Sequence, residues 1–96
     1  MTVHWTKQAQ GDLAAIHAFI TQDSPHYAGV VLARLIAAAD RLSAFPESGR
    51  AVPELEDPLV REAIHAPYRI VYRLVAPSQV HILTVHHSSR DFPREL

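Results

Sequence analysis

Histidines are the first residues in this sequence that could support metal or acid–base chemistry, and there are seven of them. Metal-binding histidine pairs usually occur at helical spacings such as H-x-x-x-H or H-E-x-x-H, which place both rings on one face of a helix. No such pair occurs here, and the adjacent His86 and His87 would point to opposite faces of a strand. We therefore expect no metal site and no cofactor.

Nucleophilic catalysis has little support in the sequence. The G-x-S-x-G elbow, the P-loop and the dinucleotide-binding fingerprint are all absent. Ser88 and Ser89 follow His86 and His87, but a catalytic triad depends on the arrangement of its groups in space, not on adjacency along the chain. We expect no serine nucleophile.

Arginines are the more informative group, because Lys7 is the only lysine and every other basic residue is Arg. The planar guanidinium can bind a carboxylate or a phosphate through two parallel hydrogen bonds. Most of the arginines lie in the second half of the chain: Arg50, Arg61, Arg69, Arg73, Arg90 and Arg94. They could form a surface that binds anions or nucleic acid.

The same half of the chain carries an equal number of acidic residues, which offers a second interpretation of the arginines. These residues are Glu54, Glu56, Asp57, Glu62, Asp91 and Glu95. The arginines could pair with them inside the fold, or face a protein partner. Because the two charges balance, we favour this second interpretation.

The composition is that of one small globular domain, with 96 residues, 48% hydrophobic side chains and a formal net charge of −1. A protein that binds nucleic-acid phosphates normally carries a clear positive excess, so the net charge argues against that class. Cysteine is absent, which excludes disulfides and thiolate metal sites. Neither a membrane-spanning apolar run nor a secretory signal is visible, so we expect a single cytoplasmic domain over residues 1–96.

A strand and two helices are predicted for the first half of the chain. Thr2–Trp5 is a candidate strand, and Ser24 and Pro25 suit the N-cap and first position of the second helix. The first helix is indicated by apolar residues on one face, namely Ala9, Leu13, Ile16 and Ile20; the second by Ala28, Leu32, Leu35, Ala39 and Leu42. Because almost no residues connect them, the helices should form an antiparallel hairpin.

The second half is predicted to be a loop followed by three strands. Repeated Pro and Gly indicate a loop over residues 46–58, which could be functional because it is long for a small domain. Alternating patterns predict strands at 59–65, 68–75 and 80–86, joined as an antiparallel meander, and then an irregular tail over 88–96.

The expected fold class is therefore α+β, with the order β-α-α-β-β-β and the helical hairpin packed on one face of a mainly antiparallel sheet. Arg69 and Arg73 would lie on the other face, joined by Arg61 if the strand register allows it. In the last strand, strict alternation would place Val80, Ile82 and Thr84 on one face. The other face would then carry His81, Leu83 and Val85. We expect most of the large aromatic residues to be core residues: Trp5, Phe19, Phe45 and Tyr72.

Four groups of residues, taken together in order and spacing, resemble the RelE/ParE superfamily of type II toxins. They are Trp5-Thr6-x-x-Ala9-x-x-Asp12-Leu13-x-x-Ile16; Pro46-x-x-Gly49-Arg50-x-Val52-Pro53-Glu54-Leu55; Arg61-Glu62 with Tyr68-Arg69-Ile70-Val71-Tyr72-Arg73; and Ile82-Leu83-x-Val85-x-His87-x-x-Arg90-Asp91. The likeness covers about residues 5–91. The β-α-α-β-β-β fold that it implies agrees with the expected order of elements.

The resemblance implies two alternative activities for a bacterial toxin of the kind that stabilises plasmids. RelE-type toxins are ribosome-dependent ribonucleases that cut mRNA in the A site, whereas ParE-type toxins inhibit DNA gyrase and are not nucleases. In both types a cognate antitoxin neutralises the toxin in a hetero-oligomer. The helical hairpin and an exposed sheet edge are the expected antitoxin surfaces. A third alternative is a degenerate member that is kept only as a binding partner.

The RNA-cleaving alternative would use Glu54, Arg69 and His87. By resemblance, Glu54 lies where some members carry the general base, and Arg69 matches an arginine that stabilises the phosphate. His87 would stand in for the His or Tyr that acts as the acid at the end of the last strand. RelE-type toxins are strongly basic and this chain is not, and its His-x-x-Arg-Asp ending is closer to the ParE-like pattern. We therefore favour the ParE-like alternative, with no catalytic residues.

For the ParE-like toxin the partners would be gyrase and an antitoxin, with no membrane involved. The candidate target-binding residues are Arg61, Arg69, Arg73, His87 and Arg90.

Overall fold

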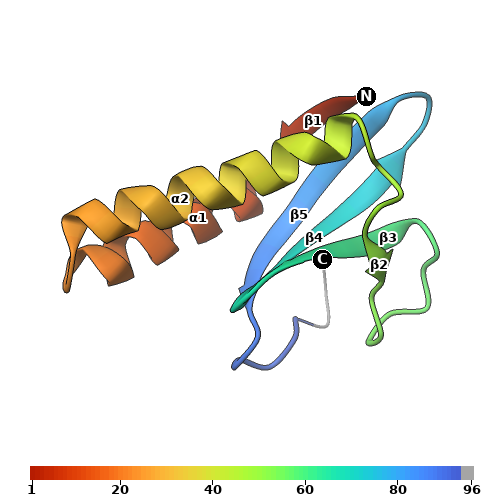
Figure 1. The fold of residues 1–96 in the computed structure, drawn as a ribbon. Helices are drawn as coiled ribbons and strands as arrows, with labels where there is room; N and C mark the ends of the chain where they lie inside the picture. Colours follow the sequence, from red (N-terminus) through yellow and green to blue (C-terminus); the bar gives the residue numbers. More distant parts are fainter. Residues whose placement is uncertain (94–96) are drawn as a thin grey trace.

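The computed structural model describes residues 1–93, and it places a helical hairpin on one face of a five-stranded sheet (Figure 1). Along the chain the elements are β1 (Thr2–Trp5), α1 (Lys7–Thr21), α2 (Pro25–Asp40), the short 3-10 helix η1 (Arg41–Ser43), β2 (Arg50–Ala51), β3 (Val60–His65), β4 (Tyr68–Val75) and β5 (Gln79–His87). Residues 94–96, part of the tail that was expected to be irregular, lie outside the described residues.

The sheet has the strand order β1-β5-β4-β3-β2. The strands β3, β4 and β5 form the antiparallel meander that was expected, and β1 joins the edge of β5 in parallel. The α+β fold class is therefore confirmed, with the hairpin on one face of a mainly antiparallel sheet. We call the face under the hairpin the helix face and the opposite one the open face. No helix in residues 1–93 is long and apolar enough to cross a membrane.

Local sequence signals fix both helix starts. The Thr6 side chain accepts a hydrogen bond from the backbone N–H of Ala9, and the Ser24 side chain accepts one from Tyr27 with Pro25 at the start of α2. The predicted caps at Ser24 and Pro25 are confirmed. Only three residues separate α1 from α2, so the helices run antiparallel, and the loop end of the hairpin projects beyond the sheet (Figure 1).

Two apolar clusters hold the layers together. The larger lies between the hairpin and the helix face and includes Leu35, Ile70, Tyr72 and Ile82. The smaller, on the open face, consists of Val52, Val60 and Val71, with Leu55, Leu83 and Phe92 packed against it.

The aromatic residues divide between the core and the surface. Tyr72 is fully buried and Trp5 packs against the larger cluster, as expected. Phe19 and Phe45 are each 65% exposed, so the prediction that they are core residues is wrong. The amphipathic pattern of α1 did not show that the loop end of the hairpin extends past the sheet (Figure 1).

Two further expectations need correction. The loop over residues 46–58 contains a short strand, β2, whose Arg50 pairs with Glu62 and whose Ala51 pairs with Arg61. In β5 the register shifts between the partners of Val71 and Tyr72. This irregularity leaves Leu83 without a partner, so the alternation reverses there and Val85 joins the helix-face cluster.

Candidate functional site

Arg69 is the centre of an ion-pair network on the open face. Its guanidinium donates to both carboxylate oxygens of Glu54, at 2.8 and 2.7 Å, and its Nε donates to Glu62 at 2.6 Å. Glu62 also accepts a 2.7 Å hydrogen bond from Nε of Arg50. Strand pairing produces this arrangement, because Glu62 lies opposite Val71 and next to Arg69 on the same face.

The pair formed by Arg69 and Glu54 favours the charged form of both side chains. The Glu62 side chain is fully buried, and the Arg69 side chain is 12% exposed. The hydrogen bonds from Arg69 lower the pKa of Glu54 from 4.5 to about 2. In return, the bonds to Glu54 raise the pKa of Arg69 above its already high value.

The segment after β5 closes over this network. The Phe92 ring lies 4.5 Å from the guanidinium carbon of Arg69, within range of a cation–π contact. Phe92 also meets the ring of His86 edge-on, with 5.4 Å between centroids. The ring Nε2 of His86 lies 2.9 Å from the backbone oxygen of Arg90. Arg69 is thus enclosed by Glu54, Glu62 and Phe92.

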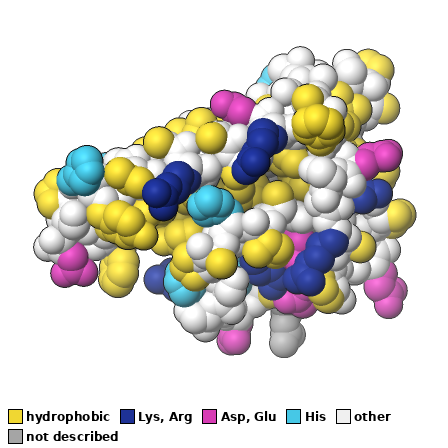
Figure 2. All heavy atoms as spheres, viewed as in Figure 1, with side chains coloured by type: hydrophobic (Ala, Val, Ile, Leu, Met, Phe, Trp, Pro, Cys, Tyr) yellow, Lys and Arg dark blue, Asp and Glu magenta, His cyan; other side chains and the backbone are white. Residues whose placement is uncertain are grey.

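The pairing interpretation of the arginines is confirmed for three of them. Arg50 and Arg69 share Glu62, and Arg73 binds Asp57 at 2.8 Å. In Figure 2 the visible Lys and Arg side chains lie in separate groups with acidic side chains among them.

Arg61 does not join Arg69 and Arg73, because its partner across the strands is Tyr72, on the helix face. Its guanidinium donates to the backbone oxygens of Glu47 and Gly49, at 3.3 and 3.0 Å. The Tyr72 hydroxyl accepts from the Gly49 N–H, and burial raises the pKa of this hydroxyl. A Cβ at Gly49 would lie 2.6 Å from the backbone oxygen of Glu62 and would also collide with the Tyr72 hydroxyl. Gly49 is therefore required by close approach.

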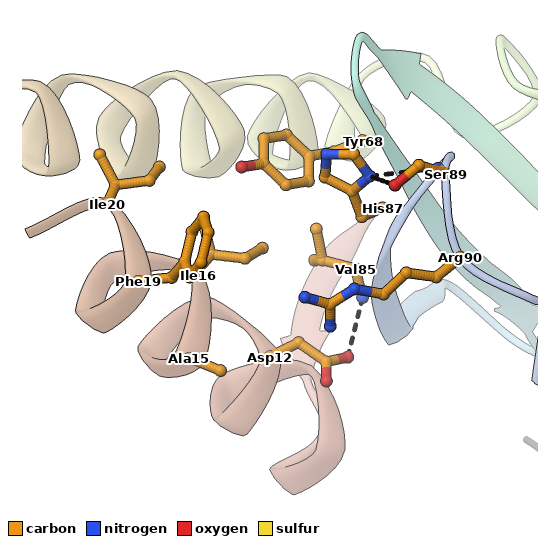
Figure 3. A pocket seen from close by; sticks show the side chains of 10 residues that line it. All are labelled: Asp12, Ala15, Ile16, Phe19, Ile20, Tyr68, Val85, His87, Ser89 and Arg90. Carbon is orange, nitrogen blue, oxygen red and sulfur yellow. Dashed lines mark hydrogen bonds between the residues drawn. The ribbon is translucent and has the colours of Figure 1, made fainter. Parts of the chain in front are cut away.

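A cleft of about 310 Å³ lies on the other side of the sheet, between α1 and the end of β5 (Figure 3). Its lining residues are Asp12, Ala15, Ile16, Phe19, Ile20, Tyr68, Val85, His87, Ser89 and Arg90. The wall formed by α1 is mostly apolar. The polar groups come from the last residue of β5 and the turn after it, namely His87, Ser89 and Arg90. The Arg90 side chain extends across the cleft toward Asp12 (Figure 3).

Asp12 has a structural role that the sequence did not reveal. Its carboxylate accepts hydrogen bonds from the Thr84 hydroxyl and, at 3.0 Å, from the backbone N–H of Val85. The side chain thus takes the place of a neighbouring strand along the free edge of β5. The sequence around Asp12 gave no signal of this role, because its partner Val85 is 73 residues away along the chain.

The sequence-predicted residues are divided between two surfaces. Glu54, Arg69 and Arg73 lie on the open face, whereas His87 packs edge-on against Tyr68, with ring centroids 5.4 Å apart, on the helix face. The structure therefore does not bring Glu54, Arg69 and His87 together. The histidine beside Arg69 is His86, its cross-strand partner. Within residues 1–93, no three His, Asp or Glu side chains are grouped so that they could hold a metal ion.

Comparison with known proteins gives consistent matches over most of the chain. Residues 3–92 match the family described as "ParE toxin of type II toxin-antitoxin system, parDE". Toxin RelE2 from Caulobacter vibrioides is 39% identical over 88 residues, covering 92% of this chain and 96% of the relative.

Two solved structures share the fold. The chromosomal ParDE toxin–antitoxin system from P. aeruginosa superposes with a TM-score of 0.73 at 25% identity, covering 91% of this chain and 95% of that chain. The toxin–antitoxin complex RelBE2 from Mycobacterium tuberculosis superposes with a TM-score of 0.64 at 28% identity, covering 90% and 95%.

Proposed function

The chain belongs to the ParE toxin family of type II toxin–antitoxin systems, and we propose that it is a ParE-like toxin that inhibits DNA gyrase by binding to it. The observation that carries the proposal is the separation of Glu54 and Arg69 from His87, which lies on the opposite face of the sheet. The residues that an RNA-cleaving relative would use for base, cation and acid therefore do not converge on one substrate position.

The open-face network is also poorly suited to cleave RNA. A general base works best when its pKa lies near the working pH, whereas the pKa of Glu54 is about 2. Both oxygens of Glu54 are bound by Arg69, whose Nε and two terminal nitrogens each donate to a carboxylate and whose side chain is only 12% exposed. The net charge of −1 adds support, since association with ribosomal RNA draws on a positive excess.

The target-binding surface that we propose is the cleft side rather than the open face. His87 and Arg90 both line the cleft, and Arg90 forms no ion pair within residues 1–93. The other three candidates, Arg61, Arg69 and Arg73, are engaged within the fold, so they contribute less to the target contact. The proposal places the toxin in the cytoplasm, where gyrase acts.

A cognate antitoxin is the second proposed partner. The two solved structures that share the fold are both of toxin–antitoxin systems. The apolar cleft wall on α1, with the exposed Phe19, offers a surface that an antitoxin segment could cover. A hetero-oligomer of this chain with its antitoxin follows from the proposal.

The test is to incubate the purified chain with gyrase and plasmid DNA, and in parallel with translating ribosomes. We expect trapped gyrase–DNA cleavage complexes and intact mRNA. Arg90→Ala should weaken trapping at least tenfold, and Arg34→Ala, an exposed arginine on α2, serves as the matched control. Cuts in the ribosomal A site with unaffected gyrase would overturn the proposal.

One alternative has specific support, namely a RelE-like mRNA endoribonuclease. The 39% identical relative is named RelE2, and His86 lies on the same face as Arg69 and Glu54. In that case Glu54→Gln and His86→Gln would each abolish mRNA cleavage by the folded protein. For the gyrase inhibitor, Glu54→Gln should leave gyrase trapping within about threefold of the parent chain.

A further inference from the structure

We propose that Phe92 is a positioning residue that anchors the segment 88–93 on the open face and thereby sets Arg90 in the cleft on the other side. Its consequence for toxicity rests on the proposed function, in which Arg90 contacts the target. The anchoring itself can be tested without any toxic activity.

The chain turns sharply where β5 ends. The backbone N–H of Ser88 donates to the oxygen of Pro67 at 2.8 Å, and that of Arg90 donates to the oxygen of His87 at 3.0 Å. The Ser89 N–H and hydroxyl approach the His87 ring at 3.1 and 2.7 Å. These bonds define a tight turn, but a turn on the surface is weakly held unless the chain beyond it is also fixed.

Phe92 supplies that fixation. It packs against the open-face cluster of Val52, Val60 and Val71, and its ring contacts both Arg69 and His86. Figure 1 shows the segment turning back from the end of β5 toward β3 and β2. The contact thus combines apolar packing with a cation–π and an edge-on aromatic component, which together hold the segment to the sheet.

Arg90 lies between the turn at Ser88 and the anchor at Phe92, and its side chain points to the cleft and not to the open face. Its backbone oxygen meets the His86 ring on the open face, while its side chain lines the cleft beside Asp12 and Tyr68 (Figure 3). The segment thus crosses the end of the sheet, and the position of the Arg90 side chain depends on whether Phe92 is seated.

This arrangement also changes the interpretation of Arg69. Its guanidinium contacts Glu54, Glu62 and the Phe92 ring, and its side chain is only 12% exposed, so little of it is available to a partner. A loss of toxicity in Arg69→Ala would then arise through the displaced segment and not through a lost target contact.

Hydrogen exchange of the backbone amides tests the anchor. In the parent chain the amides of Ser88 and Arg90 should be protected, and Phe92→Ala should speed their exchange at least tenfold. The amide of Ile70 in the central strand should be unaffected. Phe92→Tyr keeps the ring and should keep the protection, and Phe45→Ala, at an exposed phenylalanine away from the segment, is the matched control. Unprotected Arg90 in the parent chain, or unchanged exchange in Phe92→Ala, would overturn the proposal.

A double-mutant comparison of toxicity tests the consequence. Phe92→Ala and Arg90→Ala should each reduce killing at least tenfold, and the double variant should lose no more than the stronger single variant. Losses that multiply would show that Phe92 acts independently of Arg90 and would refute the coupling. If the parent chain itself does not kill, the proposed function fails, while hydrogen exchange still decides whether Phe92 positions Arg90.

Discussion

Glu62→Gln is expected to destabilise the protein strongly, although it changes only one side-chain atom. The Glu62 carboxylate is fully buried and accepts hydrogen bonds from Arg50 at 2.7 Å and from Arg69 at 2.6 Å. Glutamine keeps the shape but removes the negative charge, and its amide N–H₂ would face a guanidinium donor. Two hydrogen bonds between opposite charges are thereby reduced to at most one, in which the neutral amide oxygen accepts from a guanidinium.

The loss in the free energy of unfolding depends on how many hydrogen-bond partners Arg50 and Arg69 keep. Removing one partner of a buried ion pair typically costs about 3–5 kcal/mol, because the other charge is left without compensation. Here Arg69 keeps its two bonds to Glu54, and the Arg50 side chain is 62% exposed and can be hydrated. We therefore expect a loss of about 2 kcal/mol in the free energy of unfolding, or about 10 °C in Tm for a domain of this size.

Urea unfolding at pH 7 measures this loss, with the fluorescence of Trp5, the only tryptophan, as the signal. Glu56→Gln is the matched control, because Glu56 is exposed and forms no ion pair within residues 1–93. The control should stay within about 0.5 kcal/mol of the parent chain. If Glu62→Gln also stays within that range, the argument that Glu62 organises the open-face network is refuted.

Substitutions at three further positions probe the same framework by urea unfolding. Glu54→Gln should cost only about 1 kcal/mol at pH 7, because Glu54 is 41% exposed and its pair with Arg69 is screened by solvent. Since the folded-state pKa is lowered to about 2, the stabilisation is present above the ordinary value of 4.5 and disappears toward pH 2, so the two stability curves should converge in acid; parallel curves would contradict this. Gly49→Ala should cost about 1–3 kcal/mol, because the added Cβ displaces the loop held by the Tyr72 hydroxyl, and an unchanged midpoint would argue against the close approach. Asp12→Ala should cost about 2–3 kcal/mol by leaving the Val85 N–H unpaired, with Asp12→Asn costing less because one acceptor remains; equal losses would be inconsistent with the edge-capping role.

Local patterns were sufficient to predict most of the elements. The strands β1 and β4 have the expected ends, and the caps at Ser24 and Pro25 define the helical hairpin. These features depend on residues that are neighbours along the chain, so the sequence displays them directly. The resemblance to RelE/ParE toxins agrees with the family match over residues 3–92.

Non-local features could not be predicted in the same way. The irregularity at Leu83 reverses the alternation of β5, and β2 forms only because Arg50 and Ala51 meet β3. Phe19 looks like a core residue in an amphipathic pattern, but that pattern does not say how far the sheet extends beneath the helix. Each outcome depends on the tertiary partner of a residue and not on its neighbours.

By itself, the sequence determined the fold class, the helical hairpin, the meander and the balance of arginines with acidic residues, because these follow from composition and periodicity. The tertiary structure decided which charges meet. Strand register placed Glu62 beside Arg69 and turned Arg61 to the other face. His87 lies away from Glu54 and Arg69, because it follows His86, the cross-strand partner of Arg69. Adjacent residues in a strand point to opposite faces of the sheet. A candidate catalytic set that was plausible along the chain is thereby divided between two surfaces.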